Sequence, residues 1–175
     1  MPSTLRGEPL TPASLIEANE TIHARARLRP EYTPAYLTWL FGELAKSREQ
    51  GTFTATLVRD ERGGVAGWYA AYLRRGDVCR VFALDALPRR LDGVVDHLFG
   101  EADDAGAGAL IGRMEPRLRR PMAARGCLAH NGGSLMLVHA SDRSLMRDAQ
   151  LGQLAFSRLD AENWYWWRIV SRAVA

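Results

Sequence analysis

Three residues that could bind an anionic group, Arg89, Arg90 and Gly93, stand at the start of an amphipathic segment. Cations in the first turn of a helix oppose the helix dipole by about 0.3–1 kcal/mol each, so two adjacent arginines there need an explanation. One interpretation is that they bind an anion such as a pyrophosphate, together with the backbone N–H groups of the turn. The other is that they are two solvated side chains in a chain with a single lysine, Lys46.

Two carboxylates, Asp85 and Glu115, follow short apolar segments and could accept protons. A carboxylate serves as a base near neutral pH when burial raises its pKa. The alternative for Glu115 is a surface position beside Pro116, paired with Arg113 or Arg117, where an ion pair contributes little stability. Asp85 is a rival base by the same logic, so both assignments stay open.

These residues belong to a strand–helix–strand pattern. Residues 78–85 and 109–113 are short and apolar, as strands are. Between them, apolar side chains recur with the period of one helix face, at Leu91, Val94, Val95, Leu98, Phe99 and Ala102. A strand, a covering helix and a second strand form a crossover whose two strands lie parallel. Such units bind ligands at the carboxyl ends of their strands and anions at the helix amino end.

Upstream of the crossover, the pattern predicts two helices and an antiparallel meander. The first helix begins at Thr11 or Pro12 and ends before Arg29; the second begins at Thr33 and ends before Gly51. Turns at 60–64 and 74–77 separate strands at 53–59, 65–73 and 78–85. Residues 1–12 are expected to form an irregular arm, and Gly67 to mark a bulge or a close backbone approach.

Downstream, we expect a short basic helix at 117–125, a strand at 135–139, a helix from Ser141 or Asp142 to about Gly152, and a strand at 154–158. The arginines of the basic helix could attract an acidic substrate or form a solvated face. Residues 160–175 are an aromatic carboxyl-terminal segment, in which Trp164 to Trp167 could pack in the core or form an interface. Residues 1–175 are predicted to form a single domain.

Composition argues against several other classes of protein. Lys and Arg number 23 against 20 for Asp and Glu, a formal charge of +3, which is too small a basic excess to indicate nucleic-acid binding. No apolar run reaches the roughly 18 residues of a membrane span, and no signal peptide is evident, so a cytoplasmic location is expected. Cys79 and Cys127 are expected to be buried free thiols. The histidines show no metal-ligand spacing, so no metal is expected; His130 and His139 are more readily structural than catalytic.

The order of elements from 33 to 158 resembles the GNAT superfamily, the acyl-CoA N-acyltransferase fold. The resemblance implies an α/β (α+β) architecture with a GNAT-like mixed central sheet: an antiparallel meander, then a strand–helix–strand crossover, flanked by helices. It also implies that the two crossover strands diverge around the pantetheine arm of acyl-CoA, and that the following loop binds pyrophosphate. Arg90 and Gly93 match the loop pattern Q/R-x-x-G-x-G/A, whereas Val95 stands where a small residue is expected.

By this resemblance the chain is expected to be an acyl-CoA-dependent N-acyltransferase, with acetyl-CoA or another acyl-CoA as co-substrate and an amine of a small molecule or protein as acceptor. The residues expected to bind the co-substrate are Leu84, Ala86, Arg89, Arg90 and Gly93, and those expected to act as base are Glu115 or Asp85. The helix after Glu115 has no tyrosine, so the general acid is unassigned. The alternative is a catalytically silent GNAT-like module that binds a protein partner. The end of the chain, from Phe156 to Trp164, is similar to the carboxyl-terminal lobe of tandem GNAT-like proteins, and a single lobe would expose an apolar surface for a homodimer or a partner protein.

Overall fold

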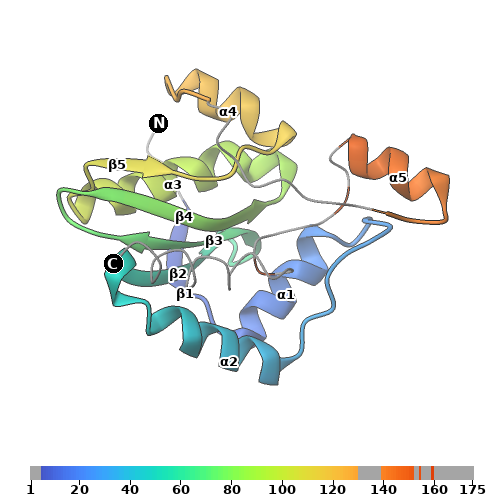
Figure 1. Cartoon of the computed structure of the whole chain (residues 1–175), viewed down its shortest axis with the longest axis horizontal. Helices are drawn as coiled ribbons and strands as arrows, with labels where there is room; N and C mark the ends of the chain where they lie inside the picture. The colour runs from blue at the N-terminus through green and yellow to red at the C-terminus, as the bar shows by residue number, and fades with distance from the viewer. Residues whose placement is uncertain (1–4, 130–138, 152–153, 155–158, 160–175) are drawn as a thin grey trace.

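The computed structural model describes residues 5–129, 139–151, 154 and 159, and a five-stranded mixed sheet lies at their centre (Figure 1). The strands follow chain order across the sheet; neighbours are antiparallel except β4 and β5, which are parallel. The predicted meander and crossover are therefore confirmed. The strands are β1 (Arg6–Pro9), β2 (Thr52–Arg59), β3 (Val65–Leu73), β4 (Val78–Ala86) and β5 (Ala109–Ile111).

The helices begin close to where capping residues predict them. Thr11 and Thr33 accept hydrogen bonds from the backbone of the first turns that follow them, and proline occupies the next position in both. The first helix ends earlier than predicted, because the chain turns back at His23 and the buried Asn19 side chain binds the carbonyl of Pro30 at 2.9 Å. The helices are α1 (Pro12–Ile22), α2 (Pro34–Ala45), α3 (Leu91–Asp104), α4 (Arg119–Ala124) and α5 (Arg143–Gln150), with short turns η1 (Arg48–Gln50), η2 (Pro88–Arg90) and η3 (Pro116–Leu118).

The expectation of an irregular arm at residues 1–12 is wrong for its described part, because β1 pairs with β2 over its whole length. Its four residues are exposed, so the sequence shows no alternation of apolar and polar residues that would predict a strand. Backbone pairing at the sheet edge forms it instead, and an edge strand tolerates a proline such as Pro9. Gly7 lets the His97 ring of α3 lie close to β1, since a Cβ at this position would lie 2.6 Å from Cε1 of His97 and would displace the ring.

The sheet separates two hydrophobic layers, because alternate side chains of each strand point to opposite faces. Trp68 and Tyr72 of β3 pack with α1 and α2 on one face, and Tyr69 and Ala71 pack with α3 on the other. Figure 1 shows α1 and α2 below the sheet and α4 above it. Both faces of β3 are buried along all nine residues, so this strand is the centre of the domain that positions the site.

A bulge in β4 interrupts this alternation next to the crossover. Ala70 of β3 lies opposite Ala83 and Ala71 lies opposite Val81, so Phe82 is an extra residue in β4. Phe82 and Ala83 consequently both pack on the α1–α2 face. Bulges bend a strand and increase its twist. The parallel ladder with β5 ends at the pair Arg80 and Ile111, just before the bulge, and from there β4 continues without a partner strand on that side among the described residues.

The later elements are described only in part. Arg27, in the loop after α1, binds Asp148 and Asp142 of the α5 region at 3.0 and 3.1 Å and so attaches this helix. The strands predicted at 135–139 and 154–158 and the aromatic segment at 160–175 fall mainly or wholly outside the described residues, as does His130. No helix in the described part of the chain has the length and apolar character needed to cross a membrane.

Candidate functional site

A cleft opens where β4 and β5 cease to pair. It encloses about 140 Å³ and runs between the second half of β4 and the segment leading from β5 into α4. Most of its lining is apolar, including Val81, Met114, Leu118 and Met122, while Glu115 is at its polar end. Gly112 lets the two segments approach, since a Cβ there would lie 3.2 Å from that of Val81. The divergence thus creates a narrow apolar slot with a charged end.

Asp85 is the penultimate residue of β4 and is the most enclosed charged group of this region, at 6% exposure. Its Oδ2 contacts Nε2 of His23, and its Oδ1 accepts from Nη1 of Arg117 and, at 2.8 Å, from the N–H of Ala86. Burial acts to raise the pKa of Asp85, but the hydrogen bond from His23 and the charge of Arg117 outweigh it and hold the pKa below the usual value. Asp85 is therefore ionised and fully engaged, which suits a positioning group better than a base.

Arg117 joins the two predicted carboxylates. Besides Asp85, it binds Glu115 through Nε at 2.8 Å and donates from Nη2 to the carbonyl of Leu84 at 3.1 Å. Burial alone would lower the pKa of Arg117. The negative charges of Asp85 and Glu115 raise this pKa by more than burial lowers it, so the guanidinium stays charged. Glu115 is half-buried, and its predicted pairing with Arg117 is confirmed. The side chain of Leu84 also lines the cleft.

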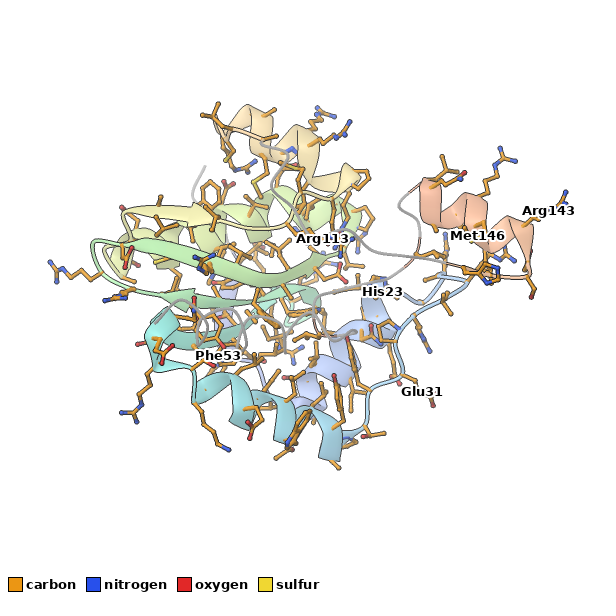
Figure 2. All side chains as sticks on the ribbon, viewed as in Figure 1. His23, Glu31, Phe53, Arg113, Arg143 and Met146 are labelled. Carbon is orange, nitrogen blue, oxygen red and sulfur yellow. The ribbon has the colours of Figure 1, made fainter. Side chains whose placement is uncertain are left out.

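His23 was not expected at this site. It is the residue at which α1 ends, and its backbone N–H still binds the carbonyl of Asn19 at 3.0 Å. Its side chain is only 16% exposed and reaches Asp85, 62 residues away in sequence. Figure 2 shows His23 and Arg113, the latter just beyond β5, toward the same end of the sheet. The sequence carried no signal for this pairing, because it depends on the early end of α1.

The His23–Asp85 pair has one consistent arrangement of hydrogens at neutral pH. An ionised carboxylate only accepts, so Nε2 of His23 must carry the hydrogen that lies between them. A neutral ring then offers Nδ1 as an acceptor, and no hydrogen bond to Nδ1 is formed by the described residues. The pair can therefore take up one proton on Nδ1, with the carboxylate stabilising the imidazolium that results.

The predicted anion-binding loop consists of η2 and the first turn of α3. One of its two arginines is already bound to another residue of the chain. Arg90 binds Asp60 of the β2–β3 turn at 3.1 Å, and its Nε is buried with no partner among the described residues. Arg89 is exposed and forms no ion pair with another described residue. Gly93 is half-buried in the first turn. Val95, which stands where the loop pattern has a small residue, is fully buried in the core.

The basic residues after Glu115 do not form one patch. Arg125 binds Asp96 and Asp92 of α3 at 2.7 and 3.0 Å, so it attaches α4 to α3. Arg119 and Arg120 are exposed. Cys79 is buried as expected, but Cys127 is only half-buried and lines the cleft. This departure follows from its position after α4, at the edge of the slot rather than beneath it.

Comparison with known proteins places the fold but not the substrate. No protein-family model and no curated protein matches the chain. Among solved structures, it is similar to a putative acetyltransferase from Agrobacterium tumefaciens, with a TM-score of 0.54 and 13% identity over 76% of this chain and 99% of that one. It is also similar to glucosamine-6-phosphate N-acetyltransferase from Arabidopsis thaliana (TM-score 0.51, 11% identity, 79% and 99% covered). A third is AAC(6′)-Iy in complex with the bisubstrate analogue CoA-S-monomethyl-acetylneamine (TM-score 0.51, 12% identity, 78% and 99% covered). At these identities the likeness is one of fold.

Proposed function

We propose that this chain, which has the fold of the GNAT superfamily as its sequence predicted, is an acyl-CoA-dependent N-acyltransferase. The observation that carries the proposal is the apolar cleft between β4 and β5, which Glu115 lines. Arg117 binds Glu115 and thereby connects the cleft to Asp85 and His23. The acceptor is an amine of a small molecule or a protein, and the donor is acetyl-CoA or another acyl-CoA. A homodimer and a cytoplasmic location remain predictions.

The residues of the cleft fit the pantetheine arm in chemistry. Its walls are apolar, and β4 has no strand partner there among the described residues, so its backbone edge can meet the amides of the arm. Leu84 and Ala86 are the β4 residues that we assign to this contact. Arg89 and Gly93 are assigned to the pyrophosphate, with Arg90 held back by Asp60. Acyl-CoA supplies the activated acyl carbon and the thiolate leaving group.

In the proposed reaction the amine nitrogen attacks the thioester carbon, the new C–N bond forms, and the C–S bond breaks. Nδ1 of His23 takes the proton that the amine loses, and Asp85 stabilises the resulting charge. The CoA thiolate leaves and is protonated from solvent. Glu115, at the polar end of the same cleft, stays the alternative base predicted from the sequence.

Two observations favour the second candidate, a silent module that binds a protein partner. The guanidinium of Arg117 already occupies the carbonyl of Leu84, and Arg90 is already paired with Asp60. Both groups are ones that the resemblance assigns to acyl-CoA or its immediate surroundings. In a module of this kind these internal contacts would be permanent.

Calorimetric titration with acetyl-CoA and with CoA decides between the two. We expect micromolar binding, about −8 kcal/mol, which Gly112→Leu abolishes because its side chain enters the slot beside Val81. Gly42→Ala is the matched control, since a Cβ at this exposed position meets no atom within 4 Å. Absence of binding at millimolar CoA by the parent protein would overturn the acyltransferase proposal and leave the silent module.

A further inference from the structure

A second hollow, of about 640 Å³, lies between α3 and the first two strands. Thr54 and Thr56 of β2 line its floor, and His97, Glu101 and Asp104 of α3 line its wall. Residues 7–9 of β1 form its rim. Leu98 and Phe99, the next residues along α3, line the β4–β5 cleft instead. The hollow is therefore separate from the proposed acyl-transfer site, and α3 stands between the two.

The polarity of the hollow is encoded in both elements that form it. On α3, the residues that line it follow the spacing of one helix face beside the buried apolar stripe: His97, Gly100, Glu101 and Asp104. On β2, the side chains that alternate toward α3 here are threonines, whereas Phe53, Ala55 and Leu57 pack on the opposite face. Where a core would place apolar side chains, this chain places hydrogen-bonding groups.

A hydrogen-bonded cluster joins the buried Tyr69 to three residues that line the hollow. The hydroxyl of Tyr69 contacts Oε2 of Glu101 and lies 2.7 Å from Nδ1 of His97, and Oγ1 of Thr56 donates to Oε2 of Glu101 at 3.1 Å. Burial, together with the hydrogen bond to Glu101, raises the pKa of Tyr69, so the phenol keeps its proton. That single proton goes to Glu101, and His97 therefore donates from Nδ1 to the phenol oxygen.

This proton count shows what the cluster leaves for a ligand. A neutral His97 keeps Nε2 as an acceptor, and Glu101 keeps Oε1, because its two donors both use Oε2. Asp104 adds an exposed carboxylate at the wall. The Oγ1 of Thr54 is buried on the floor and has no hydrogen-bond partner in the described part of the chain.

The charge of the lining selects the ligand class. Three carboxylates line the hollow, Glu8, Glu101 and Asp104, and only Glu8 is paired with a cation, Arg59 at 2.7 Å. No lysine or arginine is among the lining residues. The described residues contain no group of His, Cys, Asp and Glu side chains arranged to hold a metal ion. The complement of such a surface is an organic cation with several N–H donors.

We propose that this hollow binds a small organic cation, an ammonium or guanidinium compound, with its N–H groups on Glu101 and Asp104 and its carbon chain over the β2 floor. The site is independent of the acyl-transfer proposal, because no residue is shared between the two linings.

Agmatine, which carries an ammonium and a guanidinium on one aliphatic chain, is the probe. Calorimetry on the full chain is expected to show saturable binding, weakened about tenfold by Asp104→Asn through loss of a charge-assisted hydrogen bond. Asp103→Asn is the matched control, because it makes the same change at the neighbouring exposed position outside the hollow, and it should leave the affinity unchanged. The uncharged analogue 1,4-butanediol should not bind.

Glu101→Gln should abolish agmatine binding, and thermal unfolding checks that this variant still folds. In protein labelled at histidine, agmatine should also shift the ring resonances of His97 and leave those of His139 unchanged. The proposal is overturned if agmatine does not saturate at millimolar concentration, if Asp104→Asn and Asp103→Asn bind it equally, or if butanediol binds as well as agmatine. The Asp104 side chain forms no hydrogen bond or ion pair within the described part of the chain. The Asp104→Asn comparison therefore does not depend on the stability of Glu101→Gln.

Discussion

Arg117 and Asp85 form a partly buried ion pair, and the same guanidinium binds Glu115. The pair therefore connects the end of one crossover strand to the segment that follows the other. It also leaves Asp85 without a free oxygen, because His23 and Ala86 occupy the rest of its carboxylate. We therefore propose His23 rather than Asp85 as the proton acceptor of the site.

Replacement of His23 tests this assignment. His23→Gln should lower kcat for amine acylation by about 10²–10⁴-fold, because the general base is lost. The rate is measured as thiol release from acetyl-CoA with an amine acceptor. Glu115→Gln is the comparison variant, and a larger loss there than in His23→Gln would assign the base to Glu115 instead.

Acid sensitivity should follow the ionisation of Asp85. Its folded-state pKa lies below the unfolded value of about 3.9, so its contribution to stability is present above that pH and is lost as the pH falls through the folded pKa. Asp85→Asn should cost about 1–3 kcal/mol at neutral pH, because the partly buried Arg117 loses one of its two carboxylate partners and keeps Glu115. The variant should also lose stability less steeply below about pH 4.

Urea unfolding at several pH values measures both effects. Asp103→Asn, at an exposed position of α3, should reproduce the parent curve. An acid slope in Asp85→Asn equal to that of the parent would show that other carboxylates dominate acid unfolding.

Gly67 should be intolerant of any side chain. A Cβ there would lie 2.5 Å from the carbonyl oxygen of Asp85 and 2.7 Å from Cβ of Ala86, so the close approach predicted at this glycine is real. Gly67→Ala should destabilise the fold by about 1–3 kcal/mol through overpacking. Gly42→Ala, in an exposed turn of α2, should instead stabilise it by about 0.5–1 kcal/mol. Thermal unfolding measures the change in stability of both variants. A change of the same sign in Gly67→Ala and Gly42→Ala would contradict the close contact inferred at Gly67.

The two loop arginines should contribute unequally to CoA affinity. Arg89→Ala should weaken CoA binding by about tenfold, because its exposed guanidinium is available to a phosphate. Arg90→Ala should change it by less than about twofold, since this side chain is bound to Asp60. Calorimetry on the two single variants gives the ratio, and the reverse order would mean that CoA displaces Asp60 from Arg90.

Periodicity was sufficient to predict the crossover, the meander and the face that α3 buries. The spacing of Val94, Val95 and Leu98 alone places them on one face of a helix, and they are buried as expected. The short strand β1 could not be found in this way. It is exposed, contains Gly7 and Pro9, and exists only because β2 supplies a backbone edge.

The candidate site was only partly predictable, for a different reason. Asp85 and Glu115 could be placed at the strand ends, because that follows from the order of elements. The pairing of Glu115 with the nearby Arg117 could also be predicted, but the partners of Asp85 could not. His23 lies 62 positions before Asp85, and Arg117 lies 32 positions after it. Such pairings depend on where loops turn, as at Asn19 and Pro30, and on the bulge at Phe82. Neither leaves a periodic pattern in the sequence.

The position of α3 imposes a thermodynamic relationship on the two openings that flank it. Leu98 and Phe99 face one, while His97 and Gly100 face the other, so consecutive residues of a single helix serve both. Suppose that a ligand in one opening changes the affinity of the other opening for its own ligand by some factor. Thermodynamic linkage requires that the second ligand changes the affinity for the first by the same factor. The change in agmatine affinity at saturating CoA therefore also gives the change in CoA affinity that agmatine in the hollow would cause. This measurement needs no knowledge of the acceptor.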